Sequence, residues 1–107
     1  HNNWYPGQQL EEAAYSLKDV DTLARHSHEA FFDYMPLRPN WRGRIFRKIA
    51  RGPLCDIFML DLRTYRGPNT PNRQPHRSEE TTFFGNTQLA WIQSELRASK
   101  AVWKIIA

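Results

Sequence analysis

Cysteine is nearly absent from this sequence, which holds a single one, Cys55, among 107 residues. One thiol excludes an internal disulfide, and it also excludes a zinc site built from several cysteines. Because Cys55 opens an apolar stretch, we expect it to act as a small core residue. The sequence also lacks internal repeats, a glycine-rich phosphate loop and the paired Cys/His spacing of zinc modules, so it belongs to none of those motif-defined classes.

Long hydrophobic runs are missing as well. No stretch approaches the roughly 20 apolar residues that a helix needs to cross a bilayer. The first residues, His1-Asn2-Asn3-Trp4, do not show the basic-then-apolar pattern of a signal peptide, and the chain does not begin with Met. We therefore expect no membrane span, and we expect a chain that has been processed or cut from a longer protein.

The length and composition of the chain predict one small folded domain over residues 1–107. A domain of this size buries roughly 65% of the surface that its unfolded chain exposes. Hydrophobic residues make up 40% of the chain and aromatic residues 13%, which is more than a disordered chain carries. The four tryptophans need a sizeable core or a partner surface; they are Trp4, Trp41, Trp91 and Trp103.

Positive charge is in excess, with a formal net charge of +4 and a pI near 9.6. This balance indicates anionic partners. Six basic residues fall within fourteen positions: Arg38, Arg42, Arg44, Arg47, Lys48 and Arg51. One interpretation of this cluster is a site for nucleic acid or phosphate. The other, which we favour, is a solvated strand face or arginines paired with acidic groups elsewhere.

The first half of the chain predicts a helix followed by a hairpin. An acidic N-cap at Asp19 or Asp21 opens a helix that runs to about Tyr34, and Pro36 ends it. Strands are expected at residues 44–51 and 54–62, joined by a tight Gly-Pro turn as an antiparallel pair.

The second half predicts a long loop and then a helix and a strand. Residues 67–85 are polar and rich in proline, so we expect a functional or flexible loop. Asn86 or Thr87 is expected to cap the following helix. Residues 101–107 are expected to form a buried strand, which a right-handed crossover would lay parallel to residues 54–62. The predicted class is α/β, an α+β hairpin followed by a strand-helix-strand unit.

The uninterrupted apolar run at residues 57–60 predicts a strand that is buried on both faces. In open α/β sheets, ligands bind beyond the carboxyl ends of such strands. Asp61, Arg63, Tyr65 and Arg66 follow this strand and are therefore candidate site residues. The alternative interpretation is a salt-bridge network that closes the strand end.

Four motifs occur in an order that resembles the alkaline phosphatase D (PhoD-like) metallophosphoesterases. They are AFFDYMPLR at 30–38, RIFRKIARG at 44–52, DIFMLDLRTYR at 56–66, and GNTQLAWI at 85–92 with its continuation to 106. The resemblance covers most of the chain, from about residue 2 onward. It implies a four-layer α/β/β/α sandwich, of which residues 1–107 would be one partial domain. It also implies a two-metal enzyme that uses calcium with iron on phosphate esters and is periplasmic or secreted.

The resemblance also implies roles for individual residues. Asn2 and Asn3 match the end of the family's hallmark motif, so one of them would offer an amide oxygen to a metal, a ligand suited to calcium. Arg63 or Arg66 would neutralise the phosphate by charge-assisted hydrogen bonds, and Asp61 would orient one of these arginines.

Two classes of function follow from the sequence. The first is a fragment of a phosphomonoesterase or phosphodiesterase, inactive alone and binding neither calcium nor iron, because two asparagines cannot hold two metal ions. The second is a basic, non-catalytic domain that binds anions or nucleic acid, which the resemblance makes the less favoured class. In either case, exposed strand edges predict a homo-oligomer.

Overall fold

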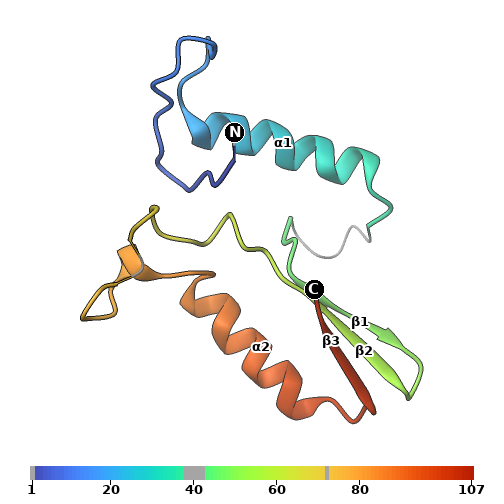
Figure 1. Ribbon diagram of the computed structural model, residues 1–107. Helices are drawn as coiled ribbons and strands as arrows, with labels where there is room; N and C mark the ends of the chain where they lie inside the picture. Colours follow the sequence, from blue (N-terminus) through green and yellow to red (C-terminus); the bar gives the residue numbers. More distant parts are fainter. Residues whose placement is uncertain (1, 38–42, 72) are drawn as a thin grey trace.

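The computed structural model of the protein describes residues 2–37, 43–71 and 73–107. The elements are, in order, α1 (Val20–Tyr34), β1 (Arg47–Arg51), β2 (Cys55–Met59), the short 3-10 helix η2 (Glu79–Thr81), α2 (Asn86–Ala98) and β3 (Trp103–Ile106). Figure 1 shows the sheet and α2 on one side of the connection from β2 to α2, and α1 with the segment before it on the other side. The mixed α/β class predicted from the sequence is confirmed.

The three strands form one sheet in the order β1-β2-β3. β1 pairs with β2 antiparallel and β3 pairs with β2 parallel, so the predicted hairpin and the predicted parallel strand are both confirmed. Ile57 of β2 lies opposite Ile49 of β1 and Ile105 of β3. Residues that are paired across strands share a face, so these three isoleucines form one apolar row.

The strands are less buried than the apolar runs predict. Within β2 only Asp56 and Phe58 are buried, so the prediction of burial on both faces was wrong. Cys55 is half-exposed, and the prediction that it lies in the core was also wrong. All four residues of β3 are exposed, with Trp103 at 68%, which corrects the prediction of a buried last strand. The physical reason is that β3 is an outer strand of the sheet, and the exposure of all four residues shows that neither of its faces is covered by another described element.

Helix α1 begins where its capping residue predicts. The carboxylate of Asp19 accepts a hydrogen bond of 2.9 Å from the amide of Thr22, which satisfies one of the amides left open at a helix start. The segment before the helix folds back on it, because the Gly7 amide donates to Asp21 Oδ1 at 2.9 Å. The helix ends at Tyr34, one residue before the C-cap Met35, which precedes Pro36.

Helix α2 begins without the predicted side-chain cap. Its N-cap is Gly85, at φ +79°, rather than Asn86 or Thr87. A Cβ at this glycine would lie 2.9 Å from Cβ of Tyr65, so both the backbone conformation and the close approach require glycine here. In the described part of residues 67–85, only η2 is regular, and the Gly67 amide donates to the Thr82 carbonyl at 2.8 Å.

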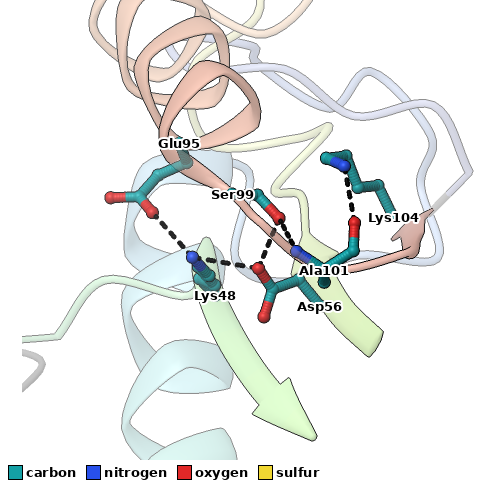
Figure 2. A network of polar contacts seen from close by, with 6 residues as sticks. All are labelled: Lys48, Asp56, Glu95, Ser99, Ala101 and Lys104. Atoms are coloured by element: carbon teal, nitrogen blue, oxygen red, sulfur yellow. Dashed lines mark hydrogen bonds and ion pairs between the residues drawn. The ribbon is translucent and has the colours of Figure 1, made fainter. Parts of the chain in front are cut away.

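A polar network joins α2 to the sheet (Figure 2). The ammonium group of Lys48 lies 3.1 Å from Asp56 Oδ2 and 3.6 Å from Glu95 Oε2. The hydroxyl of Ser99 donates to the same Asp56 oxygen at 2.6 Å and accepts from the Ala101 amide at 3.3 Å. One buried carboxylate therefore connects β1, β2, the end of α2 and the turn into β3.

The chain is flatter than a closed domain of its length. Its radius of gyration is 16.4 Å, against about 13 Å for a compact domain of this size. Its smallest extent is 19 Å. The buried apolar side chains among the described residues are few: Leu10, Val20, Phe46, Phe58, Ile92 and Ala101. Polar contacts such as those of Asp56 therefore have a large share in fixing the arrangement of the elements.

The network makes stability depend on pH through Asp56. The hydrogen bond from Ser99, and next the contact with Lys48, hold the pKa of Asp56 below its ordinary value of 3.8. Because the pKa of Asp56 is lower in the folded than in the unfolded state, the ionised carboxylate stabilises the fold at pH values above its ordinary pKa. This stabilisation is lost as the pH falls through the lowered pKa of the folded state. We expect Asp56→Asn to lower Tm clearly at pH 6 and by a smaller amount near pH 3. The exposed Asp33→Asn is the control; an equal Tm loss from Asp56→Asn at both pH values would contradict this linkage.

Candidate functional site

The candidate site starts where β2 ends, and a buried glutamine fixes that point. The side chain of Gln88, which is fully buried in α2, accepts from the Asp61 amide at 2.7 Å and donates to the Asp61 carbonyl at 2.8 Å. It also donates to the Phe84 carbonyl at 2.8 Å. Both backbone groups of Asp61 are thereby satisfied by a side chain in place of a strand neighbour.

The carboxylate of Asp61 shapes the turn that follows. Its Oδ1 accepts hydrogen bonds from the amides of Arg63 and Thr64, at 3.0 Å and 2.9 Å. This is the local arrangement by which a short acidic side chain stabilises a turn. Asp61 thus positions Arg63 through the backbone; among the described residues its carboxylate makes no ion pair with an arginine.

Two arginines and two asparagines from distant parts of the chain form one connected set, here called the arginine–asparagine chain. Arg63 Nη2 donates to Asn3 Oδ1 at 3.1 Å. Asn69 Nδ2 donates to the Asn3 carbonyl at 2.9 Å, and its Oδ1 accepts from Arg66 Nη2 at 2.7 Å. The structure therefore brings together Asn3, Arg63 and Arg66, which the sequence proposed separately as metal-binding and phosphate-binding residues.

The charges of these two arginines are not neutralised locally. Across the part of the chain that the structure describes, no carboxylate lies within ion-pair distance of Arg63 or Arg66. Neutral groups hold them instead: Asn3 for Arg63, and Asn69 with the Gly67 carbonyl for Arg66. A guanidinium has five N–H donors, so each arginine keeps donors for an anion. The salt-bridge alternative considered from the sequence is not what these contacts show.

Tyr65 anchors the backbone between the two arginines. Its ring meets Phe46 edge to face, with centroids 5.5 Å apart, and Phe46 in turn lies 4.9 Å from Trp91 of α2. Burial, followed by the nearby Asp61 carboxylate, raises the pKa of Tyr65 above its ordinary value of 10.0. The hydroxyl therefore stays protonated at neutral pH and adds no negative charge beside the arginines.

Comparison with known families shows the family to which the chain belongs. The family model described as PhoD-like phosphatase matches residues 1–107, the whole chain. The chain belongs to the PhoD-like phosphatase family. In the comparisons with curated proteins and with solved structures, nothing matched the chain. The resemblance seen in the sequence motifs is thus confirmed, and with it a phosphatase origin in a generally metal-dependent family.

One of the two asparagines assigned to metal binding, Asn3, contacts an arginine in this structure. Its Oδ1 accepts a hydrogen bond from the guanidinium of Arg63 at 3.1 Å, and the assignment of Asn2 and Asn3 to metal binding stays a prediction. Asn2 is exposed. The described residues contain no group of three or more His, Cys, Asp or Glu that could hold a metal ion. By themselves these residues do not fit the two-metal centre that the PhoD-like family implies.

Two described members of the basic cluster at residues 38–51, Arg44 and Lys48, contact other groups of the protein. Arg38 and Arg42 lie outside the described residues. Lys48 pairs with two carboxylates in the network beneath α2, and Arg44 lies 5.3 Å above the Phe46 ring. The contacts of Lys48 are of the kind expected if the cluster pairs with acidic groups, and the nucleic-acid alternative stays a prediction. No described helix is long and apolar enough to cross a membrane.

Two site residues were missed by sequence reasoning, Asn69 and Gln88. Asn69 lies in a proline-rich stretch with no periodicity, so nothing local marked it as a contact of residue 3. Gln88 lies one helical turn from Phe84 and from Ile92, and a polar residue on the buried side of an amphipathic helix was the available signal.

The lack of a side chain at Gly85 lets the start of α2 approach Tyr65 in the arginine-bearing turn. Comparison with a second glycine of positive φ tests the importance of this close approach. Gly52 has a similar positive φ, +65°, but a Cβ there would meet nothing within 4 Å. We expect Gly52→Ala to cost about 1 kcal/mol, from backbone conformation alone. Gly85→Ala adds a clash with Tyr65, which raises the expected cost to about 3 kcal/mol. Chemical denaturation measures both; equal losses would contradict the close approach.

Proposed function

We propose that this chain supplies the phosphate-binding edge of a PhoD-like phosphoric ester hydrolase. The observation that carries the proposal is the arginine–asparagine chain, in which two guanidinium groups lie at one sheet edge without a carboxylate partner among the described residues. Charge-assisted hydrogen bonds from guanidinium groups match the oxygens of a phosphate in geometry and charge. The family membership gives the anion a chemical identity, a phosphate ester.

In the proposed enzyme, the residues of this chain and the metal ions have separate roles. Arg63 and Arg66 bind and orient the ester phosphate, and Asn3 and Asn69 hold these arginines in place. In the complete enzyme, a two-metal site held by ligands outside these 107 residues would polarise the phosphoryl group and supply the nucleophile. We propose calcium with iron as the metals of the complete enzyme, and export to the periplasm or the exterior as its location. Ligands beyond these 107 residues are needed for turnover, so the chain alone binds phosphate without hydrolysing its esters.

Phosphate binding can be measured on this chain by isothermal titration with inorganic phosphate. We expect Arg63→Ala to weaken binding about tenfold or more, since one charge-assisted hydrogen bond contributes ~1.5–3 kcal/mol. Arg63→Lys keeps the charge but loses the planar fork, and an intermediate affinity is expected. Arg97→Ala, at an exposed position near the end of α2, removes an equal charge and is the control.

Two results would overturn the proposal. One is an equal loss of phosphate affinity in Arg63→Ala and Arg97→Ala, because binding would then follow net charge alone. The other is clear turnover of p-nitrophenyl phosphate by the pure chain with added calcium and iron, which would contradict the expectation that it is inactive alone.

We further propose that two copies of the chain associate through β3 and the apolar row beside it. β3 is an outer strand with unpaired backbone groups, and its Trp103 and Ile105 are exposed. A two-fold axis would pair identical edges and cover the same residues in both copies. Aromatic residues such as Trp103 are enriched at protein interfaces.

Light scattering over a range of concentrations tests this association. We expect a dimer mass for the chain, and a monomer mass for Ile105→Lys, which places a charge on the paired edge. Leu17→Lys changes an exposed leucine in the segment before α1 and should leave the dimer intact. A strictly monomeric mass for the unaltered chain at high concentration would refute the proposed association through β3.

A further inference from the structure

An apolar cavity lies beside the arginine–asparagine chain, between α1 and the segments that flank the sheet. Its volume is about 450 Å³, within the range of roughly 300–1,000 Å³ typical of small-molecule sites. Its apolar wall and the threonine that closes it are formed by Trp4, Pro6, Ala24, Phe31, Ile45 and Thr64. These residues come from the N-terminal segment, α1, the approach to β1 and the turn after β2.

Two of these residues connect the cavity to the phosphate-binding edge. Trp4 follows Asn3 directly, and Thr64 follows Arg63 directly. Neighbouring Cα atoms across a trans peptide are ~3.8 Å apart, and the described chain has no cis peptide. Asn3 and Arg63, which share a hydrogen bond, are therefore each adjacent in the sequence to a residue that lines the cavity.

Beside the hydroxyls of Ser27 and Thr64, the cavity is lined by three charged or ring side chains, Asp21, Arg25 and His28, and these three are already engaged within the protein. Asp21 accepts from the Gly7 amide at 2.9 Å, and Arg25 forms an ion pair with Glu29 at 3.1 Å. His28 Nε2 lies 2.5 Å from the Gly43 carbonyl oxygen. A polar occupant would lose its hydration against an apolar wall and gain few partners, whereas an apolar one would gain from burial.

We infer that this cavity receives the organic group of the phosphate ester, and that this group is apolar, with an aromatic ring the best match. The inference rests on the proposed function, because the arginines must hold the phosphate for the organic group to reach the cavity. The aromatic side chains of Trp4 and Phe31 provide faces and edges against which a ring can pack. The substrate class is thus an aryl phosphate or a similarly apolar phosphate ester, rather than a sugar phosphate.

The test compares 1-naphthyl phosphate with methyl phosphate, which share the phosphate and differ in the organic group. Titration of the whole chain is expected to show about tenfold tighter binding of 1-naphthyl phosphate, from burial of the ring. Ala24→Leu fills the cavity and should abolish this ratio without changing the affinity for methyl phosphate. Ala30→Leu makes the same change on an exposed face of α1 and should preserve the ratio.

A second measurement keeps the inference testable if Ala24→Leu does not fold. Nuclear Overhauser contacts between naphthyl protons and the Ala24 methyl group are expected in the unaltered chain, and Ile45→Ala should reduce the ratio. Equal affinities for the two esters would overturn the inference and leave the proposed function standing. Absence of binding by both esters would overturn both. Equally tight binding of 1-naphthol would show an apolar site that is independent of phosphate, which would also overturn the inference.

Discussion

The side chain of Gln88 is the constraint on which the candidate site depends. Its amide is fully buried and makes three hydrogen bonds to backbone groups, two of them to Asp61 and one to Phe84. Leaving a buried backbone group unpaired costs about 1–3 kcal/mol, so α2 cannot shift relative to the end of β2 without a large loss. Because Gln88 satisfies the backbone of Asp61, the carboxylate of this residue is available to cap the turn that carries Arg63.

Two further sets of contacts join α2 to the rest of the fold, and they differ in chemistry. On one side, the rings of Phe46, Tyr65 and Trp91 pack against one another and are insensitive to pH and salt. On the other, the carboxylate of Asp56 gathers the ammonium of Lys48 and a hydroxyl from the end of α2 (Figure 2). The apolar core is small, so the directional contacts of Asp56 add a specificity of arrangement that apolar packing alone would not give. The aromatic contacts thus attach the arginine-bearing turn to α2, and the contacts of Asp56 attach the sheet to the end of α2.

Much of the fold could be predicted from the sequence, because local signals determine it. The Asp19 cap, the Gly-Pro turn and the crossover length specify α1, the hairpin and the parallel strand, and all three are observed. Burial was not predictable in the same way. The apolar run at residues 57–60 shows only that its side chains favour burial, whereas tertiary packing decides which segments cover each face of the strand. The cap of α2 was missed for the same reason. Gly85 is required by the proximity of Tyr65, twenty positions earlier in the chain, and no local pattern encodes that contact. Similarly, Asn69 acquires its role only when the chain returns to Asn3.

The choice of asparagine to hold the arginines has a chemical consequence. An aspartate at position 3 or 69 would bind a guanidinium more strongly, but it would also cancel the positive charge that a phosphate needs. The neutral amides fix the geometry of Arg63 and Arg66 with ordinary hydrogen bonds and leave the charge of both in place. Asp61, two residues before Arg63, directs its carboxylate to backbone amides, and burial keeps Tyr65 protonated, so neither side chain offsets the arginines by an ion pair. Arg63 and Arg66 therefore keep their positive charge available to an anion because the groups that hold them are neutral.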